Sequence, residues 1–273
     1  MSGRPLFGAQ KEKWRGKRRG RFWKALLILF FLTHIPLSSA RDLPSQKGEL
    51  TQKAAAFFDA AGPKLTAPRV IIEDFTEQKE GEFPSGWYIL SIDVFRTRQY
   101  LVQREEGEKY LKALYVHPPT TIIKRYRFDS AEYPYLSWKW RVHLLPKGGN
   151  ELKAETNDAA AGVYVYFQSK SGTAYILKYT WSSTLPVGTV AKNPAWTEDF
   201  QTWTVVLESG SEMLNRWMSE RVNIAEDFSR IFKLEKAPQV IGIGLLTDAD
   251  STGTEAEASY DDFTIIRPQA NGS

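Results

Sequence analysis

The chain has 273 residues, with 36 lysines and arginines, 32 acidic residues and no cysteine. The absence of cysteine excludes a disulfide framework, a cysteine nucleophile and thiolate metal sites. Nine of the bases and one of the acids lie within residues 1–40, so the rest of the chain carries a net charge of −4. We therefore expect no nucleic-acid partner for that part of the chain.

Residues 1–40 have the three-part layout of a secretory signal peptide. A basic stretch over Lys11–Lys24 is followed by the apolar run Ala25–Leu32 and then by the small residues up to Ala40. The apolar run is much shorter than the roughly 20 residues of a membrane-spanning helix, so a permanent anchor is the weaker alternative. We predict cleavage after about Ala40, a periplasmic or secreted protein, and no membrane span in the mature chain.

The pattern of the mature chain is mainly that of strands. Residues 41–68 form a polar lead-in, with one short helix expected at Leu50–Ala61. From Arg69 onward, apolar and polar residues mostly alternate, which is typical of half-buried strands. We expect strands over residues 69–75, 100–102, 111–116, 121–128, 135–142, 162–167, 174–181, 201–207, 240–246 and 260–266.

One later segment has a different period. Ser211–Phe232 carries apolar residues at three-to-four spacing, which predicts one helical insertion near residues 211–232. The many short strands are separated by turn residues and do not alternate regularly with helices. They indicate an all-β fold with one domain over residues 69–268, followed by a tail at residues 269–273. The expected architecture is a single antiparallel β-sandwich or jelly roll.

A loop rich in side-chain oxygens follows the strand that ends near Leu246. This loop, Thr247–Gly253, contains Asp248 and Asp250 together with hydroxyl groups and a glycine. Hard cations such as Ca²⁺ bind about six to eight oxygens, and the same carboxylates can hold a ligand. The alternative is a tight turn whose aspartates accept hydrogen bonds from backbone N–H groups.

The first and last core strands both carry acidic residues. Glu73 and Asp74 lie in the first strand and Asp261 lies in the last. In a sandwich these strands often pair, and like charges brought together need a cation or a shifted pKa. One interpretation is a hard cation held by Glu73, Asp74 and Asp261. The alternative is that these carboxylates only face solvent.

Two further segments carry polar side chains suited to a ligand. Asn157 and Asp158 lie in a glycine-flanked loop before a strand, where Glu155 or Asp158 could also act as a general acid or base. Arg221 and Asn223 lie with Asp227 on the predicted helical insertion, where they form a ligand clamp or an internal ion-pair network. A network on the helix surface is the more common case.

Basic and aromatic residues of the middle strands complete the candidates. Arg141 and Lys178 would suit sugar hydroxyls if they share a concave face with aromatic rings. The alternative is that most of these rings pack in the core. The rings concerned belong to Trp138, Trp140, Tyr164, Tyr166, Tyr179, Trp181, Trp196 and Trp203.

Four separated segments carry a family resemblance: Tyr135–Val142, Asn157–Val165, Glu220–Asn223 and Thr247–Gly253. In this order they resemble the bacterial "domain of unknown function 3047" family. The resemblance covers about residues 69–267 and implies an exported bacterial protein with one domain, without an assigned activity. A looser resemblance, to carbohydrate-binding jelly rolls, rests on Ile72–Phe75, Gly86-Trp87 and Tyr260–Phe263. It implies a structural calcium near the first and last strands.

Three functions stay open at this point. The leading one is an exported envelope protein that binds a glycan or another envelope polymer through loops at one end of the jelly roll. The second is a polysaccharide hydrolase or lyase that uses loop carboxylates, and the third is a structural partner in an envelope assembly. Convergence of the charged candidates would favour a site. These candidates are Arg141, Asp158, Lys178, Asp248 and Asp250.

Overall fold

The computed structural model describes most of one compact unit, which spans Phe57–Ser273. The predicted signal peptide, the short helix at Leu50–Ala61 and the tail at residues 269–273 lie outside the described residues. In the part that is described, every helix is too short or too polar for a bilayer crossing. The described residues are 63, 65–89, 99–115, 119–168, 173–194, 197–198 and 200–268.

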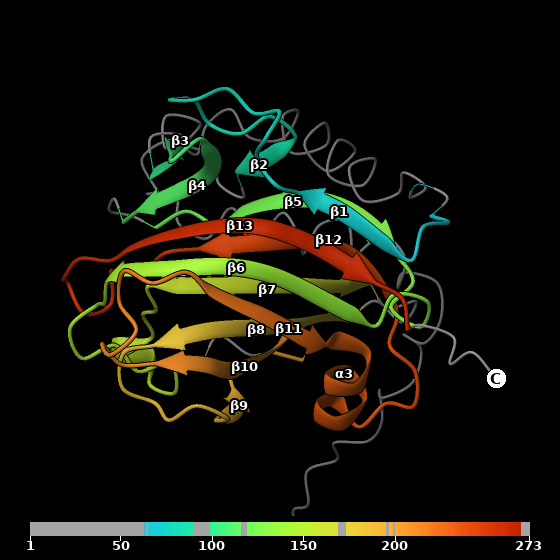
Figure 1. The fold of residues 1–273 in the computed structure, drawn as a ribbon. Helices are drawn as coiled ribbons and strands as arrows, with labels where there is room; N and C mark the ends of the chain where they lie inside the picture. The colour runs from blue at the N-terminus through green and yellow to red at the C-terminus, as the bar shows by residue number, and fades with distance from the viewer. Residues whose placement is uncertain are drawn as a thin grey trace, which may run out of the picture. The chain divides into compact units, whose positions relative to one another are not determined.

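Two β-sheets enclose one hydrophobic core (Figure 1). The six-stranded sheet has the order β11-β6-β13-β4-β3, and β1 also pairs with β13. Its strands are β1 (Arg69–Glu73), β3 (Tyr100–Glu105), β4 (Glu108–Leu114), β6 (Tyr135–Leu144), β11 (Met218–Asn223) and β13 (Glu257–Ile266).

The seven-stranded sheet has the order β2-β5-β12-β7-β8-β10-β9. Its strands are β2 (Trp87–Ile89), β5 (Ile122–Phe128), β7 (Ala161–Gln168), β8 (Ala174–Ser182), β9 (Val190–Lys192), β10 (Phe200–Ser209) and β12 (Gln239–Leu246). A one-turn 3-10 helix over Ala154–Thr156 precedes β7. The predicted all-β sandwich is therefore the observed fold.

Aromatic side chains from both sheets fill the space between them. Trp138 and Trp140 alternate inward on β6, and Tyr179 and Trp181 do so on β8. The ring centroids of Trp138 and Tyr179 lie 5.7 Å apart, and those of Trp140 and Trp181 lie 6.2 Å apart. Burying each such side chain contributes on the order of 2 kcal/mol. For these four residues the core alternative is the correct one.

The first and last strands pair as predicted. β1 and β13 are antiparallel, with Arg69 opposite Ile266 and Glu73 opposite Phe263. The same strand β13 also pairs with β4 and β6. The last strand of the domain, β13, thus lies within the six-stranded sheet and next to the first strand, β1.

One strand pair departs from the predicted antiparallel arrangement. β8 and β10 run parallel, with Lys178 opposite Thr204. The connection between them contains β9, which pairs antiparallel with β10. Because β9 carries the chain back, β10 begins at the same end of the sheet as β8. Parallel neighbours need such a longer connection, whereas antiparallel ones can be joined by a short turn.

The predicted helical insertion is a helix only in its second part. The helix α3 covers Ile224–Phe232, and β11 occupies residues 218–223 on the edge of β6. The prediction of helix before Ile224 is wrong because the edge of β6 offers backbone partners to this segment. Asn223 then begins the helix, since its side chain accepts a hydrogen bond from the N–H of Glu226 at 3.1 Å.

Candidate functional site

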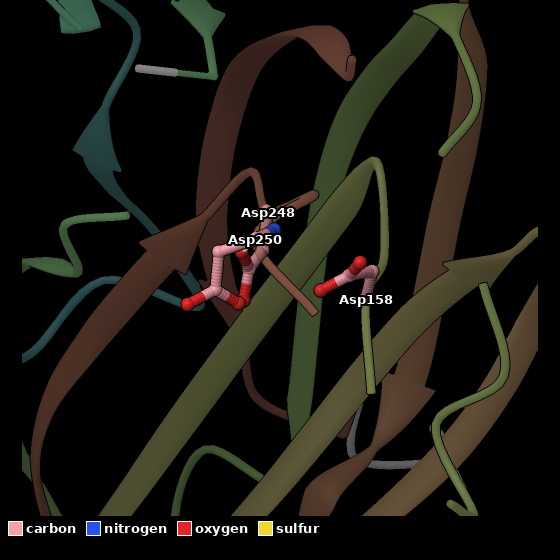
Figure 2. Close-up of side chains that lie close together, drawn as sticks. All are labelled: Asp158, Asp248 and Asp250. Carbon is pink, nitrogen blue, oxygen red and sulfur yellow. Dashed lines mark hydrogen bonds between the residues drawn. The ribbon is translucent and has the colours of Figure 1, made fainter. Parts of the chain in front are cut away.

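Three aspartates meet where β7 begins and β12 ends (Figure 2). Asp158 lies just before β7, and Asp248 and Asp250 lie in the loop after β12. Each offers a carboxylate oxygen, and these oxygens all lie within 4.8 Å of one another. The antiparallel pairing of Gly162 with Leu246 brings the two segments side by side. The carboxylate of Asp158 points toward the other two.

Asp158 shapes the loop that carries the other aspartates. It is fully buried, and its carboxylate accepts hydrogen bonds from the N–H groups of Ser251 at 3.1 Å and Thr252 at 2.6 Å. Asp248 accepts a further hydrogen bond from the N–H of Asp250 at 3.1 Å. The turn alternative considered from the sequence therefore describes how this loop is held. Among the described residues, the other carboxylate oxygen of Asp248 accepts no hydrogen bond.

Lys178 approaches the aspartates from the adjacent strand. It pairs with Tyr164 on β7, and its Cε lies 3.5 Å from the position that a Cβ on Gly162 would take. The side chain therefore extends over Gly162 at the start of β7, the strand that Asp158 precedes. Only 3% of Lys178 is exposed. Within the described part of the chain, its ammonium group has no hydrogen bond and no ion pair.

Both the lysine and an aspartate of this cluster have shifted pKa values. Burial lowers the pKa of Lys178, while the carboxylates of Glu151, Asp248 and Asp158 act in the opposite direction. Burial and the neighbouring charge of Asp250 raise the pKa of Asp248 to about 7. Opposed shifts in one cluster are typical of sites that bind or react.

Glu151 belongs to the same cluster and was missed by the sequence analysis. It is fully buried and accepts hydrogen bonds from the hydroxyls of Thr180 at 3.2 Å and Ser182 at 2.6 Å. These partners lie 29 and 31 residues further along the chain. Its only signal in the sequence is its place shortly after Gly148-Gly149, which is weak. The role of Glu151 depends on the register of β8.

Two tyrosines extend the site along the outer face of β7. Tyr164 and Tyr166 alternate with core residues, and their rings stack at 6.3 Å between centroids with an interplanar angle of 18°. Glycines make room for both rings, because a Cβ on Gly244 would lie 2.8 Å from the ring of Tyr166. A Cβ on Gly162 would lie 3.1 Å from the ring of Tyr164. Both tyrosines keep part of their surface exposed.

Arg141 does not join this cluster. It lies on β6, in the other sheet, and forms an ion pair with Glu105 at 2.7 Å. Its guanidinium lies over the rings of Tyr110 and Trp217, at 5.4 and 4.7 Å from their centroids. The residue is buried by these rings on the outer face of its sheet, which is a packing role.

The other polar candidates are also dispersed. Asn157 is partly exposed next to Asp158, and its side-chain oxygen accepts a hydrogen bond from Asn193 at 3.5 Å. Arg221 is exposed and lies over the ring of Tyr135 at 4.5 Å. Asn223 caps α3. Arg221 and Asn223 therefore stabilise local structure at the other end of β6 from the aspartates.

The carboxylates proposed for calcium lie near one another but are differently engaged. Glu73 forms an ion pair with Lys124 at 2.6 Å and accepts a hydrogen bond from the indole of Trp87 at 3.1 Å. Asp74 accepts a hydrogen bond from the N–H of Thr76. Burial and then Asp262 raise the pKa of Asp261 to about 7, and Asp74 adds to this effect. Calcium binding at these residues stays a prediction.

Comparisons with known proteins give a family. The family model described as "Protein of unknown function (DUF3047)" matches residues 85–264. No curated protein matches the chain.

Similar solved structures include two carbohydrate-binding modules. One is the family 11 module of a cellulosomal cellulase of Clostridium thermocellum, at 9% identity and a TM-score of 0.36, covering 75% of this chain and 97% of that one. The other is a family 28 module specific for non-crystalline cellulose, at 10% identity and a TM-score of 0.39, covering 75% and 96%.

A third similar structure is an enzyme. It is the xyloglucanase domain of the type three effector NopAA from Sinorhizobium fredii, at 12% identity and a TM-score of 0.36, covering 74% of this chain and 100% of that one.

Proposed function

The chain belongs to the DUF3047 family of proteins of unknown function, and we propose that this member binds a glycan or another polyhydroxylated envelope polymer. The proposed contact residues are Lys178, Asp248 and Asp250, with Tyr164 and Tyr166 beside them. We propose further that the protein acts in the periplasm or outside the cell, after removal of residues 1–40. The proposal about the location rests only on the amino-acid sequence of residues 1–40.

One observation carries the proposal of glycan binding. Only 3% of Lys178 is exposed, and its ammonium group forms no hydrogen bond or ion pair with the described residues, although it lies near the ring of Tyr164 and the charges of Glu151, Asp248 and Asp158 act on it. A buried charged donor without a partner is costly, so a ligand that supplies an acceptor is stabilised there. Neighbouring hydroxyls of a sugar supply both functions, because one accepts from an ammonium group while the next donates to a carboxylate.

The stacked tyrosines suit the same class of ligand. Sugar rings have apolar faces that pack on aromatic side chains, while polar groups at the rim set the orientation. Tyr164 lies next to the polar contacts, since the ammonium nitrogen of Lys178 is 5.7 Å from its ring centroid. The site thus combines an aromatic surface with charged donors and acceptors over adjacent strands.

Affinity electrophoresis in gels that contain single polysaccharides tests this proposal. The wild-type protein should be retarded by at least one cell-wall or capsular polymer. Lys178→Met should abolish the retardation, whereas Lys236→Met, at an exposed lysine after α3, should leave it intact.

Because Lys178→Met removes a charge from the interior, its folding is checked by circular dichroism, and Asp248→Asn provides a second variant of unchanged shape. If no polymer retards the wild-type protein or any variant, this result counts against the proposal. Equal retardation of wild type, Lys178→Met and Asp248→Asn would remove these residues from the site.

A second candidate function is hydrolysis or cleavage of such a polymer. The observation that favours it is the raised pKa of Asp248, about 7, because a general acid or base works best when its pKa is near the ambient pH. New reducing ends should then appear when the wild-type protein is incubated with the retarding polymer. Their release should disappear in Asp248→Asn, and if no reducing ends form with wild type, binding alone is the function.

A further inference from the structure

We propose that this site selects glycans without acidic groups and that Asp250 is the residue that excludes acidic ones. The inference rests on the proposed function, since it names the class of polymer that the same residues accept. Polymers built from uronic acids or carrying phosphate are excluded, and neutral or amine-bearing sugars are accepted.

The charge of the cluster carries this inference. In the described part of the chain, the cluster contains four carboxyl groups and one ammonium group. Lys178 is the cation that acts on Asp248, and it is shared with Glu151 and Asp158. One ammonium group cannot balance them all. The carboxyl groups belong to Glu151, Asp158, Asp248 and Asp250.

The internal hydrogen bonds do not remove this excess of negative charge. Glu151 is held by two hydroxyls and Asp158 by two backbone N–H groups, all of which are neutral donors. Such donors stabilise a carboxylate where it is but leave its charge in place. An acidic sugar placed at this site would add a further negative charge to an already negative cluster.

The order of burial identifies the residue that a ligand meets first. Asp158 is fully buried, Asp248 is 9% exposed, and Asp250 is exposed. Asp250 therefore lies at the solvent edge of the cluster, where an approaching polymer comes into contact with it. Like charges brought together at an interface disfavour the wrong partner more than they affect a neutral one.

Matched pairs of oligosaccharides test the inference for more than one sugar backbone. Each pair has one linkage and differs only in the C6 group: β-1,4-glucan against β-1,4-glucuronan, and β-1,4-mannan against β-1,4-mannuronan. Binding is measured by calorimetry in EDTA, so that no divalent cation masks the carboxylates. In the pair whose neutral member binds, we expect the uronate member to bind at least roughly tenfold more weakly than the neutral member at low salt. This gap should narrow as salt rises.

The variant Asp250→Asn keeps the shape of the side chain and removes its charge. This variant should raise, severalfold, the ratio of the affinity for the uronate oligosaccharide to the affinity for its neutral partner. The matched control is Glu235→Gln, at an exposed acid just after α3 and at the other end of β6, which should leave the ratio unchanged.

The two proposals fail in different ways. If neither member of any pair binds, and no polymer retards the protein in gels, the proposed function itself is wrong. If a uronate oligosaccharide binds as tightly as its neutral partner, or if Asp250→Asn leaves the ratio as in wild type, glycan binding stands and the charge selection is wrong.

Discussion

At the scale of single residues, the position of Lys178 shows how strand register creates a site. On β8, Leu177 and Tyr179 point into the core, so Lys178 lies on the opposite face, against Tyr164 of β7. There it reaches over a glycine, Gly162, which leaves room for the long side chain. Burying a lysine that has no hydrogen-bonded acceptor lowers stability, and a ligand that accepts a hydrogen bond from Lys178 would offset this cost.

Asp248 gives the first prediction, at this same scale. Its pKa is raised from 3.8 to about 7 by burial and by Asp250. The folded state therefore retains a proton that the unfolded state releases, so stability falls as the pH rises from about 4 to about 7 and stays low above that. Asp248→Asn should increase the free energy of unfolding at pH 8 by about 2–4 kcal/mol and change it little near pH 4.

Urea denaturation of wild type and Asp248→Asn at pH 4.5 and pH 8 measures this difference. Asn can still accept the hydrogen bond from the N–H of Asp250, so the loop should keep its shape. An equal difference between the two proteins at both pH values would show that Asp248 ionises normally in the folded state.

At the scale of elements, the two sheets are joined at one edge by a pair of glutamates. Glu208 is on β10 and Glu220 on β11, which belong to different sheets. Their carboxyl groups share a hydrogen bond, and Glu220 also accepts one from the indole N–H of Trp140 at 3.1 Å. Burial, followed by the charge of Glu208, raises the pKa of Glu220 to about 7.

This pair gives the second prediction. Below pH 7 the protonated Glu220 can donate to Glu208, and above it two carboxylates repel each other. The stabilisation is therefore lost as the pH rises from about 4.5 through about 7. Glu220→Gln keeps a donor at every pH and should raise the free energy of unfolding at pH 8 by roughly 1–3 kcal/mol.

Thermal melts of Glu220→Gln between pH 5 and pH 8 test this pair, with Glu212→Gln, at an exposed acid, as control. The melting temperature of Glu220→Gln should exceed that of wild type by an amount that grows with pH. A gain of the same size in Glu212→Gln would indicate a general effect of net charge instead.

At the scale of the whole molecule, the described residues form one sandwich whose core is continuous between the sheets. The first strand, β1, begins at Arg69 and the last ends at Ile266. Every strand of the described residues therefore lies between Arg69 and Ile266. This arrangement is compatible with removal of a leader after about Ala40, which stays a prediction from the sequence.

The third prediction concerns this leader. When the full chain is expressed in a Gram-negative bacterium, the mature protein should begin at Arg41, because signal peptidase needs a small residue before the cleaved bond. Ala40→Leu should retain the precursor, whereas Ser45→Leu should be processed normally. Mass spectrometry of the periplasmic fraction measures both, and an intact N-terminus in wild type would contradict the prediction.

The sequence by itself determined the fold class, the inward faces of the long strands and the identity of most charged residues at the site. Alternation of period two is a local property, so Trp138 and Trp140 could be assigned to one face before the strand order was known. Asp158, Asp248 and Asp250 could be named as candidates because carboxylates gather in loops at strand ends, and Lys178 because it is a cation on a strand rich in aromatic residues.

Only the tertiary structure decided which of these residues meet. Strand order and register depend on contacts between segments far apart in the chain. They bring Lys178 to the aspartates, add Glu151, and place Arg141 in the other sheet. The parallel pairing of β8 with β10 and the late start of the predicted helix, at Ile224, have the same origin. In each case a neighbouring strand offered hydrogen bonds that no local pattern contains.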